Sequence, residues 1–167
     1  HIKAGKILGA AIDVFPKEPA KNGRGFISPL QNLENVVLTP HIGGSTQEAQ
    51  SRIAEEVAHK LLKYSDNGST LGSVNFPSVS LPEQQLESHR ILHIHENKPG
   101  ILSHINSIFD ELKVNVLGQY LQTLDNIGYV VMDISSNNKS DNKSGLTKKL
   151  FDKLKEVPGT VKVRVLY

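Results

Sequence analysis

Residues 90–167 alternate between strand and helix patterns in the order strand, helix, strand, strand, helix, strand. The helix patterns repeat apolar residues every three to four positions, whereas the strand patterns are short apolar or alternating runs. This order is typical of the ferredoxin-like split β-α-β topology. The sequence therefore predicts a compact α+β domain here, and an exposed edge strand of its sheet would favour pairing with a second copy.

The first part of the chain, residues 1–66, carries a different pattern. Residues 7–15 and 35–39 are short apolar runs, which are typical of fully buried strands in a parallel α/β sheet. Ser45 and Glu48 match a capping box for a helix that follows them. No Gly-x-Gly-x-x-Gly fingerprint precedes these elements, so a nucleotide-binding half that would use them is expected to lie outside the chain.

Residues 67–89 separate these two parts. The stretch contains Pro77 and Pro82 and mostly polar side chains, and it begins with a turn signal at Asn67-Gly68. We therefore expect an interdomain linker here.

Composition restricts the possible functions. The 167 residues include no cysteine, which excludes disulfides, thiolate catalysis and sulfur-ligated metals and is compatible with a cytoplasmic location. The formal net charge is only +2 and the basic residues are dispersed, so no nucleic acid partner is expected. No run approaches the roughly 18 apolar residues of a membrane span, so no membrane partner is expected either.

One histidine, His41, lies between a strand that ends at Pro40 and a glycine pair that opens a helix. Glu18 lies upstream in a second proline-bounded loop. A carboxylate beside an imidazole raises the basicity of the ring, as a general base near neutral pH requires. The alternative is that both are ordinary loop residues without mutual contact, and spacing alone favours that alternative.

A second polar group lies where the first strand of the later domain enters its helix. His95, Asn97 and Gly100 occur there, and Asn115 is placed on the next strand. Free N–H groups at a helix start suit a carboxylate, and side-chain amides suit the charged groups of a small amino acid. A purely structural turn is the alternative, favoured on the residues alone. His93 shares a strand face with His95, but no third ligand completes a recognised pattern, so no metal site is predicted.

Two sequence blocks resemble one known family. The run Gly9-Ala10-Ala11-Ile12-Asp13-Val14-Phe15-Pro16, with Glu18-Pro19 and Pro40-His41-Ile42-Gly43-Gly44-Ser45-Thr46, is similar to the end of the catalytic region of D-2-hydroxyacid dehydrogenases. His93-Ile94-His95-Glu96-Asn97-Lys98-Pro99-Gly100 and Pro158-Gly159-Thr160 resemble the single C-terminal ACT regulatory domain of some members. The resemblance implies a Rossmann-like remnant over residues 1–66, a linker over residues 67–89 and a ferredoxin-like, amino-acid-binding ACT domain over residues 90–167.

The resemblance also implies a reaction and the residues that serve it. The parent enzyme would oxidise 3-phospho-D-glycerate to 3-phosphohydroxypyruvate with NAD, the first step of L-serine biosynthesis. His41 would take the hydroxyl proton, and Glu18 would hold the far ring nitrogen. Asp13 would lie near the nicotinamide, and Gly43 and Gly44 would let the backbone approach cofactor or substrate. The family's substrate-binding arginine would lie upstream, so this chain alone is expected to be inactive.

The resemblance further implies regulation by an amino-acid effector. The matching positions His95, Asn97 and Asn115 would bind L-serine as a feedback inhibitor across an interface between two ACT domains. A homodimer through these domains and a homotetrameric parent are therefore expected. Members usually carry adjacent glycines just before the regulatory strand, whereas residues 83–89 contain none. This departure concerns the transmission of inhibition rather than serine binding.

Two alternatives stay open at this point. A stand-alone amino-acid-binding regulatory module with a vestigial dehydrogenase segment would lack an upstream Gly-x-Gly-x-x-Gly unit. Another 2-hydroxyacid dehydrogenase, acting on hydroxypyruvate or formate, would share the block around His41 but would generally lack the ACT domain. The choice between NAD and NADP depends on a residue outside this chain.

Overall fold

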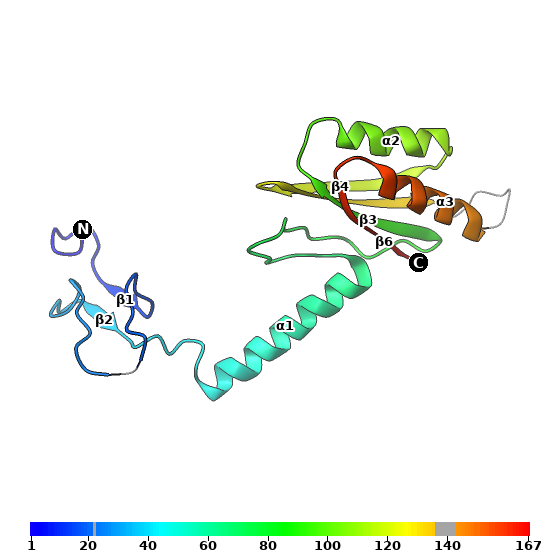
Figure 1. Ribbon diagram of the computed structural model, residues 1–167. Helices are drawn as coiled ribbons and strands as arrows, with labels where there is room; N and C mark the ends of the chain where they lie inside the picture. Colours follow the sequence, from blue (N-terminus) through cyan, green and yellow to red (C-terminus); the bar gives the residue numbers. More distant parts are fainter. Residues whose placement is uncertain (22, 136–142) are drawn as a thin grey trace. The chain divides into compact units, whose positions relative to one another are not determined.

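The computed structural model describes residues 1–21, 23–135 and 143–167. By its internal contacts the chain divides into two compact units, residues 1–57 and 58–167, and each is considered by itself (Figure 1). Within the described residues, no helix is long and apolar enough to cross a membrane.

The first unit contains a two-stranded parallel sheet. Strand β1 (Ala10–Ile12) pairs in parallel with β2 (Val36–Leu38). The sequence predicts a strand of a parallel sheet in each place, over the longer ranges 7–15 and 35–39. None of the described residues from 1 to 57 is buried, and the apolar side chain of Leu8 is 89% exposed. Two strands alone are too few to bury an apolar face.

Helix α1 (Gln47–Asn67) begins one residue later than the predicted capping box implies. The hydroxyl oxygen of Thr46 accepts the backbone N–H of Ala49 at 3.1 Å, so Thr46 is the N-cap in place of Ser45. The helix ends at the predicted turn, where the N–H of Gly68 donates to the carbonyl of Tyr64.

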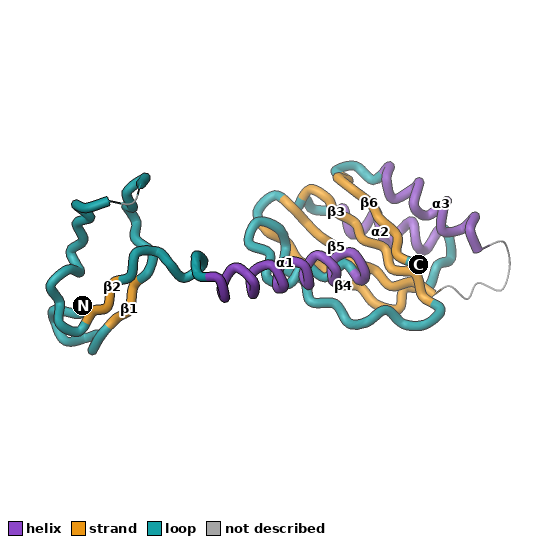
Figure 2. Tube along the Cα trace, turned by 90° about the horizontal axis from the view of Figure 1, so that it is seen from below, coloured by secondary structure: helices purple, strands orange, loops and turns teal. Residues whose placement is uncertain are grey.

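The second unit is built on a four-stranded antiparallel sheet. Its strands are β3 (Ser88–Glu96), β4 (Val116–Leu124), β5 (Ile127–Ser135) and β6 (Thr160–Leu166), in the spatial order β4-β5-β3-β6 (Figure 2). Strands β5 and β3 are central, and β4 and β6 are the edges. This is the ferredoxin-like arrangement that the sequence predicts.

Helices α2 (Ile101–Glu111) and α3 (Lys143–Glu156) cover one face of this sheet (Figure 1). Pro99 is a residue type that suits a first helical position, but helix α2 begins two residues later because Gly100, with φ of 91°, is the N-cap. The core between helices and sheet is aliphatic apart from one phenylalanine and one methionine. It consists of Ile91, Ile101, Ile105, Phe109, Val114, Val130, Met132, Ile134, Leu150, Leu154, Val157 and Val163.

The opposite face of the sheet is covered by residues 69–81, part of the stretch for which the sequence predicts a linker. Val79 and Leu81 are buried there against Leu92 and Tyr129 of the sheet. Their apolar side chains are too few and too irregularly spaced to show a strand or helix period, yet they close a second small core.

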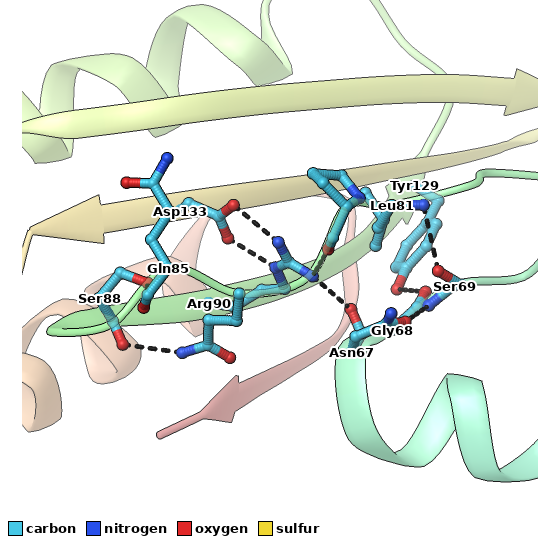
Figure 3. Close-up of polar contacts among 11 residues, drawn as sticks. Asn67, Gly68, Ser69, Leu81, Gln85, Ser88, Arg90, Tyr129 and Asp133 are labelled. Carbon is cyan, nitrogen blue, oxygen red and sulfur yellow. Dashed lines mark hydrogen bonds and ion pairs between the residues drawn. The ribbon is translucent and has the colours of Figure 1, made fainter.

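Arg90 ties this covering segment to the sheet (Figure 3). Its guanidinium is fully buried and donates to both carboxylate oxygens of Asp133, with Nε to Oδ1 at 2.6 Å and Nη2 to Oδ2 at 2.8 Å. The remaining nitrogen donates to the carbonyls of Asn67 at 3.1 Å and Pro82 at 3.0 Å. One side chain on β3 therefore holds β5, the end of α1 and the segment that follows it.

Candidate functional site

The first candidate site lies in the loops that follow β1 and β2. Nδ1 of His41 lies 2.7 Å from Oε2 of Glu18, so the structure brings together the two residues that the sequence singles out. The backbone N–H of Phe15 donates to the other oxygen of Glu18 at 2.8 Å and fixes the direction of this carboxylate. With Nδ1–H donated to Glu18, Nε2 of His41 is left as the proton acceptor.

The charges of this pair stabilise each other. The hydrogen bond that His41 donates to Glu18, followed by the negative charge of Glu18, raises the pKa of His41 above its ordinary value. The same hydrogen bond, with that from Phe15, holds the pKa of Glu18 below its ordinary value. The side chain of His41 is 53% exposed, so Nε2 remains accessible to a small molecule.

Asp13 lies at the end of β1 and binds the turn that carries His41. Its Oδ1 accepts the hydroxyl of Thr39 at 2.5 Å and the N–H of Ile42 at 2.9 Å, and its Oδ2 accepts the N–H of Gly43 at 2.9 Å. The Thr39 hydrogen bond and then the two backbone N–H groups hold the pKa of Asp13 below its usual range. Sequence reasoning missed Thr39, although its place at the strand end before Pro40 was a usable signal.

A cavity of about 790 Å³ opens beside His41. Its walls combine apolar side chains, among them Phe15, Phe26 and Ile42, with the Glu18–His41 pair. Gly44 lines it too, and a Cβ there would meet only Ile53 at an ordinary 3.8 Å. Mostly apolar walls with a few polar groups are typical of small-molecule sites, and the apolar part fits a planar nicotinamide ring.

The second candidate site lies at the end of β3. Nδ1 of His95 lies 2.8 Å from the carbonyl of Glu96 and must donate to it, which leaves Nε2 as an acceptor. Nε2 is buried and has no hydrogen-bond partner among the residues that the structure describes, a rare state for a buried polar atom. The ring lies so close to Gly128 that a Cβ at that position would overlap the imidazole.

Asn97 lies close to this histidine, whereas Asn115 does not. The side chain of Asn97 donates to the carbonyl of Asp125 at 3.1 Å, at the turn between β4 and β5. The carbonyl of Asn115 accepts the N–H of Ser135 at 3.0 Å, at the far end of the same two strands. Eight strand steps of about 3.4 Å separate these ends, about 27 Å in all. One copy of the chain therefore cannot bring all three side chains to one small ligand.

His93 is a structural residue of the core. Its Nε2 lies 3.0 Å from the hydroxyl of Thr160, and burial lowers its pKa to about 4. Across the parts of the chain that the structure describes, no three His, Cys, Asp or Glu side chains are grouped so as to hold a metal ion.

Two family models match the chain, one within each unit. Residues 1–43 match the model of the D-isomer specific 2-hydroxyacid dehydrogenase, NAD binding domain. Residues 91–162 match the model of the AHAS small subunit-like ACT domain. The chain therefore joins a segment similar to the NAD binding domain of D-2-hydroxyacid dehydrogenases to a segment similar to an ACT domain, and the cofactor of the first domain's family is NAD.

Over nearly its whole length the chain is similar to D-3-phosphoglycerate dehydrogenases. It is 58% identical over 166 residues to that of Haemophilus influenzae, which covers 99% of this chain and 38% of the relative. It is 55% identical over 161 residues to that of Escherichia coli K12, covering 96% and 37%, and 42% identical over 166 residues to that of Dictyostelium discoideum, covering 99% and 38%. The chain thus spans less than two fifths of the length of these relatives and matches their C-terminal part.

Proposed function

We propose that the chain is the C-terminal part of an NAD-dependent enzyme that oxidises 3-phospho-D-glycerate to 3-phosphohydroxypyruvate in the cytoplasm. The observation that carries the proposal is the 2.7 Å contact between His41 and Glu18, in a chain 58% identical to a D-3-phosphoglycerate dehydrogenase. The names of the relatives support the substrate, and the match of residues 1–43 to an NAD binding domain supports the cofactor.

His41 is the general base in this proposal. Its Nε2 takes the proton from the C2 hydroxyl of the substrate as the alkoxide turns into a carbonyl. Glu18 holds Nδ1–H, keeps the ring in the required tautomer and stabilises the imidazolium that forms. NAD, when bound, would supply the acceptor for the hydride that leaves C2. The apolar wall beside His41 would carry the nicotinamide ring, and Gly44 lines the same cavity.

The test is NAD reduction by the complete parent enzyme with 3-phospho-D-glycerate. His41→Asn should lower kcat by a factor of about 10²–10⁴, the usual contribution of a general base. His59→Asn is the matched control, because His59 is an exposed histidine on α1 and should leave the rate unchanged. A His41→Asn enzyme with normal kcat would refute the proposed role of this histidine.

The proposal includes L-serine as an effector of the ACT domain, bound by His95 and Asn97 of one copy and Asn115 of another. The unpartnered acceptor Nε2 of His95 suits the ammonium group of an amino acid. Asn97 and Asn115 lie at opposite ends of the sheet, which supports a site shared between two copies.

Strand β4 is the edge through which two copies would join, as a homodimer within a homotetrameric parent. An antiparallel pair of β4 strands centred near Tyr120 would place Asn115 of one copy beside Asp125 of the other. Asp125 holds Asn97, so this pairing would complete the effector site twice. The edge also exposes Leu117 and Leu121, which are 43% and 39% accessible.

Calorimetric titration of this chain with L-serine, with D-serine as control, tests the effector site. Stereoselective binding of about one serine per chain is expected. Leu121→Lys on the β4 edge should abolish both binding and sedimentation as a dimer, because a buried lysine is costly. Leu86→Lys, at a side chain 97% exposed in a loop, should change neither. A strict monomer that binds L-serine would contradict the shared site.

A further inference from the structure

The backbone of His41 is held in a conformation that residues other than glycine rarely adopt. Its φ is +53°, in the left-handed region. Such residues persist only where surrounding contacts over-determine them, and they cluster at active sites. The direction of the imidazole depends on this backbone torsion, because the side chain leaves from the same Cα. The contacts that fix the backbone of this turn therefore also set the direction of the His41 ring.

Asp13 contacts the turn on both sides of His41. Its carboxylate accepts the hydroxyl of Thr39, two residues before His41. It also accepts the N–H groups of Ile42 and Gly43, the two residues after His41. The N–H of Thr39 also donates to the carbonyl of Ile12 at 3.0 Å, which extends the β1–β2 ladder up to this point. The turn is thus fixed at three places to β1 and its end, while the histidine between them carries the strained torsion.

Gly43 is the residue that admits this carboxylate. A Cβ on Gly43 would lie 2.9 Å from Oδ2 of Asp13, closer than carbon and oxygen approach without a bond. The need for glycine at this position therefore comes from Asp13. The neighbouring Gly44 has no such crowding.

We propose that Asp13 is a positioning residue that aims His41 at Glu18 and the substrate, and that Gly43 makes room for its carboxylate. This inference rests on the proposed function of His41 as the base. It differs from the role near the nicotinamide that family resemblance implies for Asp13. Three of the roughly four acceptor positions of the carboxylate are already used by the turn, and Asp13 does not line the cavity beside His41.

Nuclear magnetic resonance of this chain tests the geometry without reference to catalysis. The three-bond HN–Hα coupling and Cβ shift of His41 report its φ, and the ring shifts report its pairing with Glu18. Asp13→Asn and Gly43→Ala should both lose the positive-φ signature and the pairing. Glu34→Gln, at an exposed carboxylate of the same unit, should keep them. A wild-type chain without positive φ at His41, or an Asp13→Asn chain that retains it, would overturn the proposal.

Steady-state kinetics of the complete parent enzyme separate positioning from cofactor binding. Asp13→Asn should lower kcat about 100-fold, the effect of a misplaced reacting group, with KM for NAD changed by less than about twofold. Gly43→Ala should show the same split while it keeps the carboxylate. A raised KM for NAD at normal kcat would overturn the positioning role but leave the proposed function standing. Only a normal kcat in His41→Asn would refute that function itself.

Discussion

Replacing Arg90 by methionine should destabilise the second unit strongly. Methionine keeps much of the volume but removes the charge and all four hydrogen bonds that Arg90 donates. Asp133, only 5% exposed, would keep a buried negative charge without a counter-charge, and two carbonyls would lose their donor. Removing one partner of a buried ion pair costs about 3–5 kcal/mol of unfolding free energy. In a unit of this size that corresponds to a fall in Tm of about 12–20 °C.

Urea unfolding followed by circular dichroism measures this loss. Lys98→Met is the matched control, because it removes a cation from an ion pair whose two side chains are 68% and 48% exposed. That change should cost at most about 1 kcal/mol. The double variant Arg90→Met/Asp133→Leu should recover a large part of the loss, since a buried pair can be exchanged for apolar residues at little cost. Recovery should be incomplete, because the carbonyls of Asn67 and Pro82 still lack their donor.

A loss below about 1 kcal/mol in Arg90→Met would refute the reasoning, because removing the guanidinium that pairs with a buried carboxylate should cost several times more. A double variant as unstable as the single one would show that the unpaired charge of Asp133 is not the main cost.

Three further predictions concern pH and backbone conformation. Burial lowers the pKa of His93 to about 4 from the ordinary 6.5, so the unfolding free energy should fall as pH drops through this interval. The loss approaches about 3 kcal/mol, and His93→Gln should flatten it in urea titrations at several pH values. Lys113 has φ of 54° just after the end of α2; Lys113→Gly should stabilise the unit by about 0.5–1 kcal/mol, whereas Lys113→Ala should not. Glu18→Gln should lower the pKa of His41 toward its ordinary value and move the rising limb of kcat/KM in the parent to lower pH; an unchanged histidine titration would exclude the pair.

The helices of the second unit were predictable because their burial follows a local period. Ile101, Ile105 and Phe109 recur every four residues and all three are buried, as the pattern of α2 requires. The ends were less certain. Pro99 looks like a first helical residue, but the positive φ of Gly100 delays the start, and a conformation of that kind leaves only a weak trace in sequence.

Contacts between distant segments could not be predicted in the same way. The pairing of Arg90 with Asp133 requires the register of β3 against β5, which places the two residues opposite each other although 43 positions separate them. The separation of Asn97 from Asn115 likewise depends on the antiparallel course of β4 and β5. The contact of Glu18 with His41 was expected only from family resemblance, because loop residues carry no period that relates one loop to another.

The close approach of Gly128 to His95 has an evolutionary consequence. A single nucleotide change can convert a glycine codon into one for a residue with a side chain. Any side chain at position 128 would push the imidazole of His95 out of its place. If the ring binds the effector as proposed, sensitivity to serine can be lost by a substitution that touches neither the effector nor the catalytic histidine. Selection for overproduction of serine would then be expected to recover changes at this inconspicuous strand position beside those at the binding residues themselves.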